Sequence, residues 1–149
     1  MVRSTVSPIM NQPGRFTAFA GFEWSAAGLV NLHRVIIFRD GPGMTTKIIP
    51  FSQSDSTKPE DLWAFLDNYE AIYGGAVMAI PHNSNVSSGE MFATHQYGGD
   101  PITIEWATTR NRFEPLMEIT QFKGDSEAHP ALSPTDEFAD FETWNTQQR

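Results

Sequence analysis

The sequence predicts an α/β domain in which parallel strands are flanked by helices. Five apolar residues, Ala76–Ile80, stand between a Gly-Gly pair and a polar segment that contains His82. A short apolar run bounded by turn residues is typical of a strand buried on both faces. A helical pattern ends at the same Gly-Gly pair, and the order helix, glycine turn, buried strand is typical of parallel α/β layers.

The composition excludes several classes of protein. At 149 residues the chain has the length of about one domain and can bury a core. A net charge of −8 without a basic cluster argues against a nucleic-acid surface. Because there is no cysteine, disulfides and thiolate metal sites are excluded, and metal ligands would be His, Asp or Glu. No stretch approaches the ~20 apolar residues of a membrane span.

The first third of the chain predicts two strands after an irregular arm. Residues 1–16 contain two prolines and no periodicity, and they lack the apolar core of a signal peptide, so the compartment stays open. Residues 17–24 are mostly apolar and predict a buried strand with Glu23 near its end. A second strand is expected over residues 33–39, a β-branched run that His33 opens and a turn sequence follows.

The clearest helix signal lies over residues 59–73. Thr57 and Glu60 have the spacing of a capping box, Pro59 falls in the first turn, and the Gly-Gly pair ends the helix. Apolar side chains recur at helical spacing: Leu62, Phe65, Leu66, Tyr69 and Ile72. We expect this stripe to pack into the core. Before this helix, the sequence also predicts a short strand over residues 47–51.

The second half of the chain predicts a long loop followed by further elements. Residues 83–99 are rich in Ser, Asn and Gly, and we expect an exposed loop, although Glu90 or His95 could there touch a substrate. The later expected elements are a helix over residues 100–112, a strand over 115–122, a polar loop over 123–130 and a helix that begins near 133.

Four polar side chains lie on the predicted strands where a core would exclude them: Glu23, His33, His82 and Glu118. A carboxylate in a buried strand is costly unless it is paired or binds a metal. One carboxylate with two or three histidines is a fair ligand set for a divalent cation. The other interpretation is structural, with His82 capping its strand and bonding to backbone. Spacing alone does not decide, because the sequence contains no HxH and no HExxH motif.

Four short motifs resemble those of the polymerase-and-histidinol-phosphatase (PHP) superfamily of metal-dependent hydrolases. They read GFEW at residues 21–24, LHRVI at 32–36, AIPH at 79–82 and MEI at 117–119. The chain is more similar to a branch of that superfamily known as a domain of unknown function. That similarity lies in FxGFEWSA, NLHRxxIFRD, IPHNSN and EPLxEITQxKGDSExHP followed by SPxDEFADFE, and it extends from Phe16 to Glu142.

The resemblance implies a fold and a set of site residues. The implied fold is a partial, distorted TIM-like (β/α)7 barrel of PHP type, with parallel strands near residues 17–24, 33–39, 76–82 and 115–122. Glu23 would bridge two metals, and His33 and His82 would bind one of them, the cation being zinc, manganese or iron. Residues implied to contact substrate or to support the ligands are Asn83, Glu118, Lys123, Glu127 and His129.

The implied activity is metal-dependent hydrolysis of a small-molecule ester, a phosphate ester or a related one. The N-terminal HxH strand and the C-terminal Asp-x-His motif of PHP proteins have no counterpart here. The resemblance therefore implies that residues 1–149 form a single partial domain from the middle of a longer enzyme. The alternative is a catalytically incompetent fragment or a non-enzymatic α/β domain that self-associates into a homo-oligomer through uncovered strands.

Overall fold

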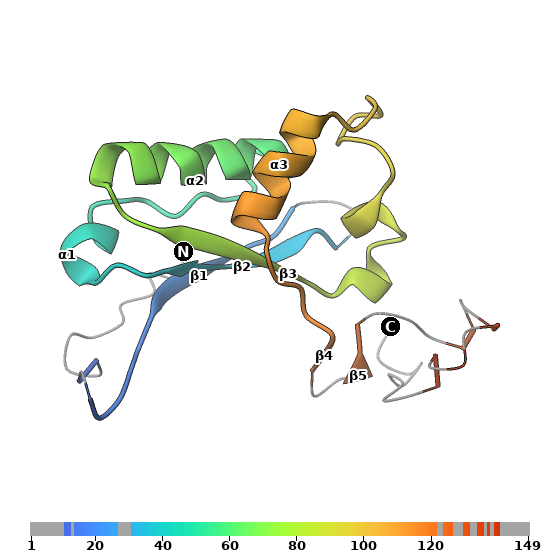
Figure 1. Ribbon diagram of the computed structural model, residues 1–149, viewed down its shortest axis with the longest axis horizontal. Coiled ribbons are helices and arrows are strands. Elements are labelled where there is room, and N and C mark those ends of the chain that lie inside the picture. The colour runs from blue at the N-terminus through green and yellow to red at the C-terminus, as the bar shows by residue number, and fades with distance from the viewer. Residues whose placement is uncertain are drawn as a thin grey trace.

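A three-stranded antiparallel sheet with helices on one face forms the centre of the computed structural model (Figure 1). The structure describes residues 11–12, 14–26, 31–121, 124–126, 130–131, 134–135, 137 and 139–140. The strands of the sheet are β1 (Ala20–Trp24), β2 (His33–Phe38) and β3 (Val77–His82). The helices are α1 (Pro42–Thr45), α2 (Pro59–Tyr73) and α3 (Ile104–Phe113), with short 3-10 turns at Ser84–Val86 and Glu90–Phe92. Two further strands of two residues each, β4 (Thr120–Gln121) and β5 (Gly124–Asp125), pair with each other as an antiparallel hairpin.

The prediction of a parallel, TIM-like barrel is wrong. The strand order is β1-β2-β3, and both neighbouring pairs are antiparallel. The segment between α1 and α2, residues 46–58, explains why β3 is antiparallel to β2, because it carries the chain back along the sheet before α2 begins (Figure 1). The chain therefore enters β3 from the end at which it left β2. A parallel pair would need the helix itself to make that return. The described strands do not close into a barrel.

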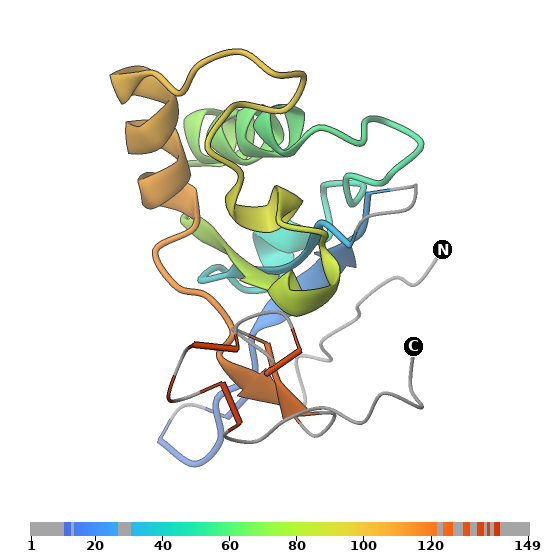
Figure 2. The same ribbon diagram turned by 90° about the vertical axis from the view of Figure 1, so that its right-hand side faces the viewer.

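The two faces of this sheet have different neighbours, and the strand register shows which residues lie on each face. The covered face packs against α2 and α3 and carries Ala20, Phe22, Trp24, Arg34, Ile36, Phe38, Val77, Ala79 and Pro81. The open face carries Gly21, Glu23, His33, Val35, Ile37, Met78, Ile80 and His82. Figure 2 shows both long helices on one side of the sheet. The prediction that residues 76–82 are buried on both faces is therefore wrong: Met78 and Ile80 are partly exposed.

Helix α2 forms where the sequence predicted it and supplies much of the core. Pro59 is at its first position, and Gly74 ends it with a left-handed φ of 64°. The apolar stripe packs on the covered face, except that Ile72 is 62% exposed. The predicted capping box does not form, because Lys58 is the N-cap and makes no side-chain cap bond. Glu60 instead accepts hydrogen bonds from the Trp106 side chain and the Tyr97 backbone.

The elements predicted after residue 83 form only in part. Helix α3 begins at Ile104, capped by the Thr103 hydroxyl, and not at residue 100. Of the strand predicted over residues 115–122, only β4 forms, because Leu116 and Ile119 are more than half exposed and offer no buried edge. Residues 47–51 form no strand. The helix predicted from residue 133 lies mostly outside the described residues, and those described there form turns. No described helix has the length and apolarity to cross a membrane.

A buried carboxylate joins the sheet to both long helices. The Glu114 carboxylate follows α3 and is 1% exposed. It accepts hydrogen bonds from Arg34 Nε of β2 at 2.9 Å and from Trp63 Nε1 of α2 at 2.8 Å. Arg110 Nε of α3 lies 3.2 Å from its second oxygen. Because Arg34 is itself only 2% exposed in its side chain, this ion pair lies inside the core.

A second polar junction fixes the ends of β2 and α2 at the start of β3. The Asp40 carboxylate accepts hydrogen bonds from the Tyr69 hydroxyl at 3.0 Å and from the Ala76 backbone at 2.8 Å. Gly75 leaves room for this contact, since a Cβ there would lie 2.3 Å from the Asp40 oxygen. Burial and then the bond to Asp40 raise the pKa of Tyr69 to about 12.

Removing the Glu114 charge is expected to destabilise the fold strongly. Glu114→Gln leaves two guanidinium groups in or near the core without a counter-charge, which costs about 3–5 kcal/mol of unfolding free energy. Asp67→Asn is the matched control, because Asp67 pairs with Arg112 at the surface. Its expected cost is about 0.2–1 kcal/mol. Urea unfolding followed by circular dichroism measures both, and equal losses in the two variants would contradict the role given to Glu114.

The Tyr69–Asp40 bond predicts a loss of stability at alkaline pH. An unfolded tyrosine ionises near its ordinary pKa of 10, whereas folded Tyr69 stays neutral to about 12. The stabilisation is therefore complete below pH ~10 and is lost as the pH rises toward ~12. Tyr69→Phe should lose less stability over this interval than wild type, as measured by urea unfolding at several pH values. Tyr97→Phe, at an exposed tyrosine, should behave as wild type.

Candidate metal centre

The antiparallel register brings three predicted ligands to one end of the open face. His33 begins β2 and His82 ends β3, and the two stand directly opposite each other. Glu23 pairs with Val35 and so lies diagonally across from His33 on the same face. Side chains that are far apart in sequence are neighbours because neighbouring strands run in opposite directions.

A single carboxylate oxygen contacts both imidazoles. Glu23 Oε1 lies 3.0 Å from His33 Nδ1 and 3.0 Å from His82 Nε2. The two rings meet edge to face, with centroids 5.6 Å apart. One potential ligand atom from each residue lies within 4.8 Å of the other two. The side chains run from nearly buried to open, at 11% exposure for His82, 26% for His33 and 52% for Glu23.

The second nitrogen of His82 also has a fixed neighbour. Its Nδ1 lies 3.4 Å from the Ile80 carbonyl oxygen, while its Nε2 faces Glu23. Both neighbours are hydrogen-bond acceptors, and a neutral imidazole carries only one N–H. In the tautomer with its proton on Nδ1, that N–H faces the Ile80 carbonyl and the Nε2 lone pair is left to bind a cation. An Nδ1–H that bonds a backbone carbonyl is the usual support for a histidine that binds metal through Nε2.

The electrostatics of Glu23 favour its charged form. Partial burial raises the pKa of Glu23, but the hydrogen bonds from His82 and His33, with their charges, outweigh it and lower the pKa below the ordinary value. The carboxylate is therefore ionised near neutral pH and is available as a ligand. Ser25 Oγ, 3.4 Å from His33 Nδ1, is a further polar neighbour of the cluster.

The cluster opens into a cleft of about 510 Å³ on the open side of the sheet. Its lining consists of Glu23, Val35, Ile80, His82, Asn83, Glu118 and Gln121. The chain after α3 supplies one wall, and Figures 1 and 2 place the following β4–β5 hairpin on the side of the sheet away from α2. The backbone N–H of Glu118 bonds the Pro81 carbonyl at 3.0 Å and ties this wall to β3. The cleft is large enough for a small organic ligand.

Two predicted supporting residues belong to one hydrogen-bond network in the cleft. Gln121 Nε2 donates to Glu118 Oε1 at 2.8 Å and to Asn83 Oδ1 at 3.0 Å. Ser126 Oγ also donates to Glu118. Asn83 has a left-handed φ of 61°, which aims the chain after β3 toward this wall. The Glu118 carboxylate is thus held in the cleft that contains Glu23 and His82.

The remaining predictions for the site divide into two groups. Lys123, Glu127 and His129 lie outside the described residues. Glu90, which begins a 3-10 turn, and His95 are both exposed and lie outside the cluster of Glu23, His33 and His82. The segment 83–99 is only partly the exposed loop that was expected, because Ser87 and Met91 are buried. The sequence reasoning missed Gln121, which orients Glu118. Its only signal was its place in the EITQ part of the longest motif.

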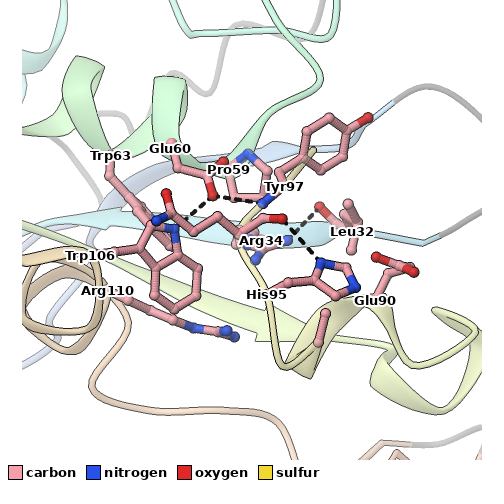
Figure 3. A pocket seen from close by; sticks show the side chains of 12 residues that line it. Leu32, Arg34, Pro59, Glu60, Trp63, Glu90, His95, Tyr97, Trp106 and Arg110 are labelled. Atoms are coloured by element: carbon pink, nitrogen blue, oxygen red, sulfur yellow. Dashed lines mark hydrogen bonds between the residues drawn. The ribbon is translucent and has the colours of Figure 1, made fainter. Parts of the chain in front are cut away.

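A second cavity lies between the loop that follows β3 and the helices, and it has a packing role. Figure 3 shows Arg34, Glu60, Trp63, Trp106 and Arg110 around it. Its volume is about 20 Å³, room for about one water molecule. Its charged groups are neutralised locally: the two arginines pair with the Glu114 carboxylate, and Glu60 accepts from the Trp106 indole and the Tyr97 backbone. Charge balance and small size argue against a substrate site here.

Comparison with known proteins identifies one family. The family described as "Protein of unknown function (DUF3604)" matches the chain over residues 4–149. No curated protein and no solved structure matches the chain.

Proposed function

The chain belongs to the DUF3604 family, and we propose that it is a metal-dependent ester hydrolase whose cation is held by Glu23, His33 and His82. The observation that carries the proposal is the convergence of three potential ligand atoms: Glu23 Oε1 lies 3.0 Å from His33 Nδ1 and 3.0 Å from His82 Nε2. An Nδ1–H directed at the Ile80 carbonyl would leave His82 Nε2 as the atom that binds the cation beside Glu23.

The donor set fits a borderline divalent cation. Two imidazoles and one carboxylate suit zinc, manganese or iron, and three protein ligands leave positions for water and substrate, as catalytic sites require. When bound, such a cation acidifies water and polarises a phosphoryl or carbonyl oxygen. The resemblance to PHP hydrolases supports a phosphate ester or a related ester as substrate.

The other residues of the cleft have roles that follow from their chemistry. Hydrolysis adds water across the ester bond, giving an acid and an alcohol. Glu118, held by Gln121 and Ser126, offers a fixed acceptor for a hydroxyl or another donor of the substrate. The buried His82 and the β3 backbone keep one side of the cleft rigid, which favours a single orientation of the bound ester.

Metal binding is the first test of this proposal. Purified protein stripped with chelator should bind Zn²⁺ or Mn²⁺ in calorimetric titration, and His82→Ala should weaken binding on the order of 100-fold, because a ligand is lost. His95→Ala is the matched control, since His95 is an exposed histidine outside the cluster. Equal affinity in wild type and His82→Ala would contradict the assigned ligands.

Catalysis is tested separately on a panel of nitrophenyl phosphate mono- and diesters and carboxylic esters, with Mn²⁺ or Zn²⁺ added. We expect kcat/KM of the best substrate to fall at least ~100-fold in Glu23→Gln, because the cation loses its carboxylate. His95→Ala should retain wild-type rates. Wild-type rates no faster than those of Glu23→Gln on every ester would overturn the hydrolase assignment, even if the metal binds.

A further inference from the structure

An apolar row continues from the metal cluster along the open face. Beyond His33 and His82, the next directly opposed pairs are Val35–Ile80 and Ile37–Met78. The first pair lines the 510 Å³ cleft. The second pair lines an adjoining groove of about 350 Å³, together with Phe19. We call the four paired residues the apolar track.

The track has the length of an extended chain. From His33 to Ile37 the strand advances four residues, or about 13 Å at ~3.3 Å per residue. All four side chains of the track are apolar, and Arg39 stands at its far end, beside the groove. A ligand that leaves the cleft along the sheet therefore meets only apolar side chains before it reaches the guanidinium.

We propose that the substrate is an amphipathic ester whose alkyl or acyl chain lies on the apolar track while its ester group lies at Glu23, His33 and His82. This inference rests on the proposed function and names its substrate class. Continuity argues for one ligand in both places, because Val35 and Ile80 line the cleft and stand next to Ile37 and Met78 on the same face. Removing a chain of this length from water supplies binding energy in proportion to its covered area.

The shape of this face favours a narrow ligand over a flat protein surface. Glu118 and Gln121 form a wall of the cleft against the sheet residues, and the β4–β5 hairpin lies on the same side (Figure 2). A second copy of the chain would have to pack over this wall. Yet Val35 at 38% and Phe19 at 57% exposure remain open to a thin ligand.

The experiment compares butyl phosphate with decyl phosphate, below the micelle-forming concentration, by calorimetric titration with saturating Zn²⁺ and again with EDTA. An open face covers one side of a chain, so each methylene should strengthen binding about twofold, half the free energy of full burial. Over six methylenes decyl phosphate should bind on the order of 50-fold more tightly. The gain from chain length should persist in EDTA, whereas zinc should strengthen binding of both phosphates.

The double variant Ile37→Thr/Met78→Thr tests the track itself. It should lower the affinity for decyl phosphate about tenfold. Its affinity for Zn²⁺ should stay within about twofold of that of wild type, which shows that the variant is folded. Ile72→Thr is the matched control, because Ile72 is 62% exposed on α2, which packs on the covered face. It should bind decyl phosphate as wild type does.

The possible results separate the two proposals. Equal binding of butyl and decyl phosphate, or an unchanged decyl affinity in the double variant, overturns the substrate class. A chain-length gain without any zinc dependence supports the track and overturns the metal-dependent function. If wild type is a dimer by light scattering, the double variant is monomeric and decyl phosphate does not bind, the open face belongs to a second copy and the substrate proposal fails.

Discussion

The buried Glu114 carboxylate is the contact on which the arrangement of sheet and helices depends. It joins Arg34 of β2, Trp63 of α2 and Arg110 of α3, so three elements meet on one charge. A buried carboxylate is costly to desolvate, and this cost is offset only while its donors stay in place. The helices are thereby held to the covered face, and Arg34 also stacks near the Trp24 ring at 5.6 Å. Neither long helix covers the open face.

Because side chains alternate between the two faces of a strand, the packing of the helices on one face places the three candidate ligands on the other. Arg34 faces the helices, so its neighbour His33 must face the open side, and the same rule sends Glu23 and His82 there. The backbone bonds of an antiparallel sheet then set the spacing of the three side chains. The proposed metal centre is thus built on strands and not on loops, which gives its ligands defined positions. The proposed apolar track follows from the same alternation two and four residues farther along β2.

The sequence correctly predicted individual helices and strands, whose signals are local. It misled about strand direction, which depends on the path of the chain between strands. The strand predicted over residues 33–39 forms over His33–Phe38, and the strand ending at His82 and the helix from Pro59 to Gly74 also form, because periodicity and end signals act within one element. The prediction that β2 and β3 are parallel was wrong because residues 46–58 carry the chain back along the sheet before α2 begins. This irregular segment has no hydrophobic periodicity from which its path could be predicted. Glu118 was expected within a strand, yet it lies in an irregular segment, which the bond from its own N–H to the Pro81 carbonyl joins to β3.

By itself the sequence determined which residues were candidates for a functional site. Without cysteine, and with Glu23, His33 and His82 placed on strands, it restricted any metal site to carboxylate and imidazole ligands. Only the tertiary structure decided that one oxygen of Glu23 meets both rings, that Gln121 holds Glu118 beside them, and that an apolar row leads away from the cluster. The physical reason is that the sequence itself gives the residue types, whereas long-range contacts set strand direction and register. One such contact joins Arg34 to Glu114, 80 positions apart in the chain.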